Sequence, residues 1–194
     1  MRLLFGLILL LSFGNLMAQS PTIEFTTKNG TDREKAVIPR VQKLLDTYDL
    51  SRWIFTKKVI IEAFAIPHSH PVLTLNTKPN TEDELLSTFL HEQIHWYEDA
   101  RPAKVNKAIE EFKTIYPEVP VGRPEGAKSE FSTYLHLIIC YLEYQSMIAL
   151  VGEERAKKVM LDSNHYQWIY DKVVNETETL ARVVKKHGLG LLNQ

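Results

Sequence analysis

The residues with the clearest chemical meaning form a five-residue run, His91-Glu92-Gln93-Ile94-His95. On a helix, side chains four positions apart lie one above the other on the same face, so His91 and His95 can point two imidazoles at one metal ion. Glu92 projects beside them, where its carboxylate can hold and deprotonate a metal-bound water. The spacing therefore predicts a metal centre with a general base next to it.

The segment that contains this run carries strong helical signals. Thr81-Glu82-Asp83-Glu84 fits a capping box, with Thr81 as N-cap and Glu84 reaching back to it. Apolar residues then recur at helical spacing, at Leu85, Leu86, Phe89, Leu90, Ile94 and Trp96. The alternative is an amphipathic helix whose two histidines are four apart by chance. A metal is the better explanation, because burying two histidines and a glutamate without a partner is costly.

The run and its uncharged surroundings, Thr88-Phe89-Leu90 before it and Trp96-Tyr97 after it, resemble the zincin metallopeptidases. The resemblance implies one Zn²⁺ per chain, Glu92 as general base, and hydrolysis of a peptide bond in a peptide or protein substrate. It also implies a small sheet packed on the motif helix, with an edge strand that pairs with an extended substrate. Val72–Thr77 is the candidate for that strand, although an ordinary paired strand explains the segment equally well. The family's usual third-ligand patterns close behind the motif are absent.

A catalytic zinc site takes three protein ligands, so the third must come from later in the chain. The apolar stretch from Ser129 to Val151 is the natural source, because it contains His136 and Glu143. These two residues share a helix face but lie about 10 Å apart along its axis, so one of them is expected to contact the metal. We favour Glu143, which gives a His-His-Glu site as in the Glu-zincins, with His136 as the alternative. The one that is not a ligand, His136 in the favoured arrangement, could polarise a substrate carbonyl or orient a ligand imidazole.

Further residues are candidates for contacting the substrate. His165, Tyr166 and Tyr134 could stabilise the oxyanion of a tetrahedral intermediate, although plain packing is the alternative for each. His68 and His70 lie in a turn bounded by prolines, close in sequence to the motif helix. They could bind substrate or a second metal, and an exposed turn is the alternative.

The order of predicted elements indicates an α+β fold in one zincin-like domain over residues 19–194. A small N-terminal sheet packs on the motif helix, and a mostly helical C-terminal half follows. The predicted strands are Thr22–Thr27, Lys58–Ile66 and Val72–Thr77. The predicted helices cover residues 32–48, 81–101, 103–115, 129–151, 153–161 and 166–187, with Pro39 expected to kink or delay the first of them.

The first residues predict export. Residues 1–18 have a short basic start, an apolar run and a small residue, Ala18, which is typical of a cleaved signal peptide; an uncleaved anchor is the rival interpretation. The protein is thus expected to be secreted or periplasmic. No later segment is predicted to span a membrane, because Leu135–Leu150 contains polar residues. The only cysteine, Cys140, leaves no internal disulfide, and a net charge of −1 suggests neither nucleic acid nor an anionic membrane as a partner.

The sequence therefore predicts an exported zinc metallopeptidase. One alternative is a non-catalytic zincin-like binding domain with a structural or vestigial metal site. Another is a metal hydrolase that acts on a bond other than a peptide bond. The sequence does not specify the substrate, the choice between endo- and exopeptidase activity, or the oligomeric state.

Overall fold

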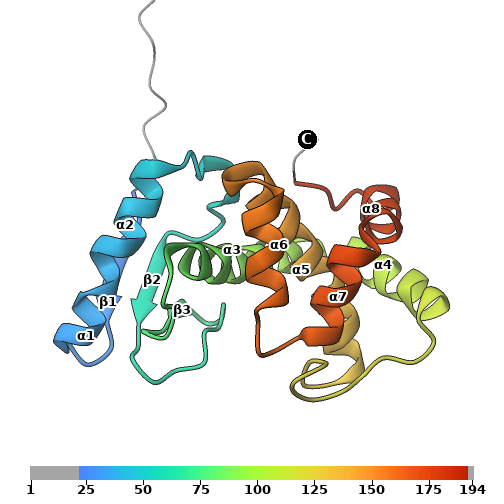
Figure 1. Ribbon diagram of the computed structural model, residues 1–194, viewed down its shortest axis with the longest axis horizontal. Coiled ribbons are helices and arrows are strands. Elements are labelled where there is room, and N and C mark those ends of the chain that lie inside the picture. The colour runs from blue at the N-terminus through green and yellow to red at the C-terminus, as the bar shows by residue number, and fades with distance from the viewer. Residues whose placement is uncertain (1–21, 192–194) are drawn as a thin grey trace, which may run out of the picture.

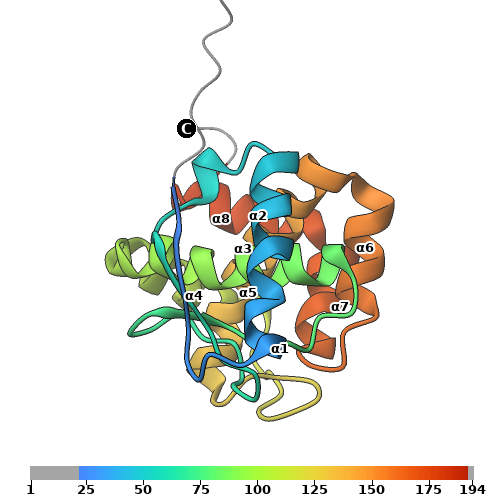
Figure 2. The ribbon, with the colours of Figure 1, turned by 90° about the vertical axis from the view of Figure 1, so that its left-hand side faces the viewer.

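The computed structural model describes residues 22–191, so the predicted signal peptide over residues 1–18 lies outside the described residues. Near the N-terminus, β1 (Glu24–Thr27), β2 (Lys58–Ile61) and β3 (Leu73–Leu75) form one sheet in the order β1-β2-β3. Both pairs of strands are parallel. The sheet lies at one end of the molecule, beside α2 (Figures 1 and 2).

The second predicted strand, Lys58–Ile66, is too long. β2 ends at Ile61, after which the Glu62 N–H donates to the carbonyl of Leu75 at 2.9 Å. The Ala65 N–H then donates to the Glu62 carbonyl at 3.2 Å, which turns the chain away from the sheet. The apolar residues that follow therefore lie in a loop, because a hydrogen-bonded turn replaces the strand ladder.

Helices form most of the remaining described chain, which confirms the predicted α+β class with a small sheet. They are α1 (Asp32–Lys35), α2 (Val37–Thr47), the 3₁₀ turn η1 (Ser51–Trp53), α3 (Glu82–Asp99), α4 (Pro102–Ile115), α5 (Glu130–Val151), α6 (Glu153–Leu161), α7 (Gln167–Asn175) and α8 (Thr177–Lys186).

Two predicted helices are each divided in two. The first breaks at Ala36, and Pro39 then falls in the first turn of α2, where its missing N–H is not needed. The last, over residues 166–187, breaks at Glu176, whose φ of −118° and ψ of 29° are not helical. The Glu176 carboxylate accepts a hydrogen bond from the Tyr116 hydroxyl at 2.8 Å, and this contact ties the break to the end of α4.

Side-chain caps fix where α3 and α5 begin. Thr81 accepts a hydrogen bond from the Glu84 N–H at 3.1 Å, and Ser129 accepts one from the Ser132 N–H at 3.1 Å. The predicted capping box at α3 is only half formed, because the Glu84 carboxylate accepts from the Asn80 N–H at 2.8 Å.

Helix α5 is the centre of the helical part, since it packs against α3, α4, α6, α7 and α8 (Figure 1). By length and composition alone α5 could also cross a membrane, but 61% of its most apolar window is buried within the described part of the protein. Because α3 and α5 pack directly on each other, polar residues on their facing sides must meet in the interior.

Candidate metal centre

Three histidine rings meet where α3 faces α5. His91 and His95 come from α3 and His136 from α5. Their ring centroids are 5.1 Å apart for His91–His95, 5.5 Å for His91–His136 and 5.3 Å for His95–His136. One ring nitrogen from each lies within 4.8 Å of the others. Three rings in a nearly equilateral triangle, each with a nitrogen within 4.8 Å of the others, match the donor set of a three-histidine metal site.

A neighbouring acceptor holds the second ring nitrogen of His136 but not that of His95. The Nδ1 of His136 is 2.6 Å from the backbone carbonyl of Ser132, which can only accept, so His136 carries its proton on Nδ1 and leaves Nε2 free for a metal. The Nδ1 of His95 faces Glu98 Oε1 at 3.6 Å, longer than a hydrogen bond. A fixed tautomer and ring orientation is the arrangement that ligand histidines require.

Glu143 lies beside the triangle and supports it. Its Oε2 is 2.8 Å from Nδ1 of His91, and its Oε1 accepts a hydrogen bond from the Ser87 hydroxyl. The Tyr170 hydroxyl donates to Oε2 at 3.2 Å. The geometry thus differs from the favoured expectation: His136 groups with the motif histidines, and Glu143 orients His91. The reason is that α5 crosses α3 with His136 level with the motif, which leaves Glu143 two turns further along.

His91 also belongs to a second group of candidate ligands. One atom each of His91, Cys140 and Glu143 lie within 4.8 Å of one another, and all three residues are buried. In this group, however, the carboxylate is already bound by His91 and by two hydroxyls. Burial raises the pKa of the Cys140 thiol to about 11, which keeps it protonated. The three-histidine triangle is therefore the better fit to a metal ion.

The charge states of the motif residues follow from their enclosure. Burial, followed by the proximity of His91, lowers the pKa of His95 to about 2 and that of His136 to about 3, so both rings are neutral. A neutral imidazole is the form that binds metals. Burial raises the pKa of Glu92 to about 7, while His91 and His68 oppose the increase. Glu92 is only 5% exposed and lies on the motif helix beside the two ligand candidates.

Tyr166 and His165, the two candidates for contacting substrate that precede α7, lie beside the centre. The Tyr166 ring centroid is 4.5 Å from that of His136 and 6.0 Å from that of His91. Tyr166 holds this place with a left-handed backbone, at φ 56°, which costs free energy in a non-glycine residue. His165 stacks edge-on to Tyr166 at 5.1 Å. Tyr134, by contrast, is fully buried and donates its hydroxyl to the Tyr116 carbonyl at 2.6 Å, away from the centre.

The turn with His68 and His70 packs on the end of the motif helix. The Trp96 indole N–H donates to the Ser69 carbonyl at 3.0 Å, and His70 stacks on the Trp96 ring at 4.2 Å. His70 also pairs with Asp99 at 2.9 Å. These contacts dock the turn beside the centre without adding its histidines to either group of candidate ligands within the described residues.

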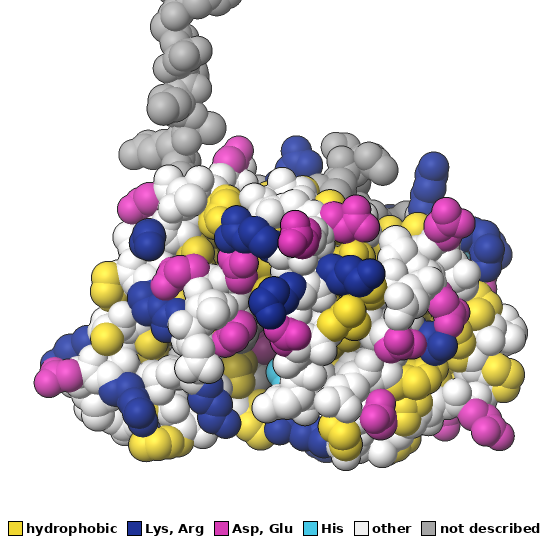
Figure 3. Space-filling model, viewed as in Figure 1, with side chains coloured by type: hydrophobic (Ala, Val, Ile, Leu, Met, Phe, Trp, Pro, Cys, Tyr) yellow, Lys and Arg dark blue, Asp and Glu magenta, His cyan; other side chains and the backbone are white. Residues whose placement is uncertain are grey.

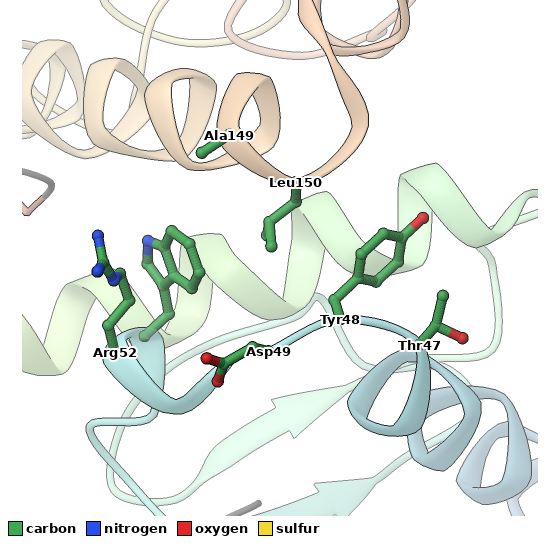
Figure 4. A pocket seen from close by; sticks show the side chains of 7 residues that line it. Thr47, Tyr48, Asp49, Arg52, Ala149 and Leu150 are labelled. Carbon is green, nitrogen blue, oxygen red and sulfur yellow. The ribbon is translucent and has the colours of Figure 1, made fainter. Parts of the chain in front are cut away.

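Figure 3 shows part of a histidine side chain at the bottom of a hollow, in the lower half of one face of the molecule. A separate hollow of about 420 Å³ lies between the end of α2, η1 and the last turns of α5 (Figure 4). Ala149 on its wall is 13 residues from His136, or about 20 Å along the helix, so this second hollow is remote from the histidines.

Comparison of the chain with protein-family models, curated proteins and solved structures finds no match. The fold and the site together define a helix-rich α+β protein with a three-histidine candidate metal centre and an adjacent carboxylate.

Several residues of the centre carry signals too weak to find from the sequence. Ser87 lies one turn before His91, and Cys140 lies one turn after His136, so both share faces with candidate ligands. Tyr170 belongs to a helix whose orientation the sequence does not specify. The Ser132 carbonyl is a backbone group, so the amino-acid type at this position does not indicate its role.

Proposed function

We propose that this protein is an exported zinc-dependent metallopeptidase. The observation that carries the proposal is the grouping of the His91, His95 and His136 ring nitrogens within 4.8 Å, next to Glu92 on the helix that presents the first two histidines. Three imidazole ligands suit Zn²⁺, and three protein ligands leave a tetrahedral ion one position for water or substrate.

A zinc ion held there would act as a Lewis acid and lower the pKa of a bound water towards neutrality. Glu92 would act as general base, accepting a proton from the attacking water and passing it to the leaving amine nitrogen. The Tyr166 hydroxyl is the nearest candidate for donating to the oxygen of the substrate carbonyl, with His165 beside it.

The residues around the triangle have supporting roles. Glu143 would orient His91 through its Nδ1, and the Ser132 carbonyl would orient His136. Ser87 and Tyr170 would hold the Glu143 carboxylate in place. These contacts would fix the His91 and His136 rings before any metal binds, so these two rings would lose little conformational entropy on binding.

The test combines metal content with hydrolysis. We expect about one zinc per chain in the purified protein and none in the His91→Ala variant. Glu92→Gln should keep the zinc and lose about 10²–10⁴-fold in turnover of peptide substrates, the usual contribution of a general base.

Other outcomes would point elsewhere. Undiminished peptide hydrolysis by Glu92→Gln would remove Glu92 from the mechanism. A zinc-loaded parent that cleaves no peptide would favour the non-catalytic binding domain, and cleavage of other bonds alone would favour a different metal hydrolase. A folded parent that cannot be loaded with zinc would refute the metal centre.

A further inference from the structure

Large apolar side chains that face solvent are concentrated in two segments. Of the five exposed ones in the described chain, Phe64 is 85% exposed, Ile66 63%, Val121 59%, Phe131 53% and Leu161 47%. The first two belong to the loop between β2 and β3, here called lip 1 (residues 62–72). The next two belong to lip 2 (residues 117–131), the loop before α5 with the first residues of that helix. Exposed apolar side chains that gather beside a candidate site indicate a binding surface.

Lip 1 is attached to the motif helix next to the metal centre. The Ser69 carbonyl accepts from Trp96, which directly follows His95, and His70 stacks on the same indole. His68 directly precedes Ser69 in this turn. Ile66 is two residues from His68, and its carbonyl is 2.9 Å from the His68 Nδ1.

Lip 2 is attached to the other side of the same centre. The Pro124 carbonyl accepts from the N–H of Gln167, the residue after Tyr166. The end of lip 2 leads directly into Ser132, whose carbonyl holds His136. The two lips thus border the histidines from the sheet side and from the α5–α7 side. In Figure 3, hydrophobic side chains lie along the lower edge of the face on both sides of the hollow with the histidine.

The sheet edge next to the site is already paired. Thr74 in the middle of β3 donates its N–H to the His68 carbonyl at 2.7 Å and accepts from the His68 N–H at 3.1 Å. The neighbouring Ser69 carbonyl is used by Trp96. An extended peptide therefore finds no free main-chain groups at Thr74, and the predicted role of this strand in pairing with substrate loses its physical basis. Substrate recognition must depend on side chains instead.

We propose that the site takes peptide segments with large apolar side chains on both sides of the bond to be cleaved, one side packing on lip 1 and the other on lip 2. This inference rests on the proposed peptidase function. Burial of Phe64, Ile66, Val121 and Phe131 against a substrate would remove apolar surface that the protein otherwise leaves in water. Polar segments of the same length would leave that surface exposed.

The experiment compares two internally quenched peptides of equal length, with Leu and Phe or with Ser and Gln flanking the cleavage site. The parent should have a kcat/KM at least about tenfold higher for the apolar peptide, the usual effect of filling a hydrophobic pocket. The paired substitutions Phe64→Ser with Ile66→Ser, and Val121→Ser with Phe131→Ser, should each remove most of this preference. Phe64→Leu with Ile66→Leu should retain it, and so should Leu161→Ser, which alters an exposed apolar residue on neither lip.

Equal kcat/KM for the two peptides in the parent, or an unchanged preference in both serine variants, would overturn the inference. So would lip variants that keep the preference and lose only binding to neutral phosphatidylcholine vesicles, which would make the lips a membrane contact.

Fluorescence anisotropy of the same peptides, labelled and mixed with the zinc-loaded parent, separates the two proposals. If the parent binds the apolar peptide selectively, the serine variants lose this selectivity and no hydrolysis occurs, the role of the lips in recognition is supported and the peptidase function is refuted. Hydrolysis without apolar selectivity would support the peptidase function and refute the role of the lips in recognition. Neither binding nor hydrolysis would refute both.

Discussion

Replacing Glu143 by Gln separates a carboxylate that orients a histidine from one that binds the metal. Gln has the same shape and can still accept from His91 Nδ1, which lies 2.8 Å from the carboxylate, while the Ser87 and Tyr170 hydroxyls can rotate to suit the amide. Only the charge is lost. Mutation of a residue that orients a ligand histidine typically weakens metal binding about 10–100-fold, which is about 1.4–2.8 kcal/mol at 1.4 kcal/mol per tenfold.

The assay is competition for zinc against a chromophoric chelator, with zinc per chain measured separately at saturation. Glu143→Gln should weaken the affinity within the stated range and still reach about one zinc per chain. His136→Ala should fail to reach that stoichiometry, because it removes a ligand. Circular dichroism and thermal unfolding of both variants provide the control for folding. If Glu143→Gln could not be saturated while His136→Ala bound one zinc normally, Glu143 would be the third ligand and the geometric argument would be refuted.

Three further predictions concern other parts of the chain. Burial opposes ionisation of Glu34, but hydrogen bonds from the N–H groups of Thr31, Ala63 and Asn29 and from the Asn29 side chain lower its pKa to about 2, from an ordinary value of 4.5. The contribution of the Glu34 carboxylate to stability is therefore complete above about pH 4.5 and is lost as the pH falls towards 2. In urea unfolding, Glu34→Gln should be less stable than the parent at pH 7, and this difference should disappear near pH 2. A loss of stability that does not depend on pH would contradict the assignment. Tyr166→Phe should lower kcat about 10²–10³-fold without changing zinc content, as for loss of an oxyanion donor, whereas an unchanged kcat would assign Tyr166 to packing. Gly126→Ala would place a Cβ 2.0 Å from the carbonyl oxygen of Pro120, so we expect a loss of about 1–3 kcal/mol in urea unfolding, and wild-type stability would show that the turn can relax.

The sequence predicted the elements whose signals are local. The start of α3 after Thr81 followed from a capping residue ahead of an apolar run with helical spacing, and the start of α5 near Ser129 followed from its apolar run alone. The proximity of His91 and His95 followed from helix geometry alone, because residues four apart share a face. The α+β class followed from strands that precede helices.

Local signals failed where contacts between distant residues decide the outcome. The last predicted helix breaks at Glu176, whose carboxylate accepts from the Tyr116 hydroxyl. These two residues are far apart in sequence. The edge of β3 is closed by His68 for the same kind of reason: an isolated bridge across a loop leaves no pattern in residue types.

The choice between His136 and Glu143 shows most clearly what the sequence determines and what depends on helix packing. The sequence by itself determined that both lie on one face of one helix, two turns apart, and that one of them belongs beside the motif. It could not determine which one, since periodicity fixes the spacing along a helix but not where two helices cross. Only the packing of α5 on α3 decided this, by bringing His136 level with the motif histidines and setting Glu143 against the far nitrogen of His91.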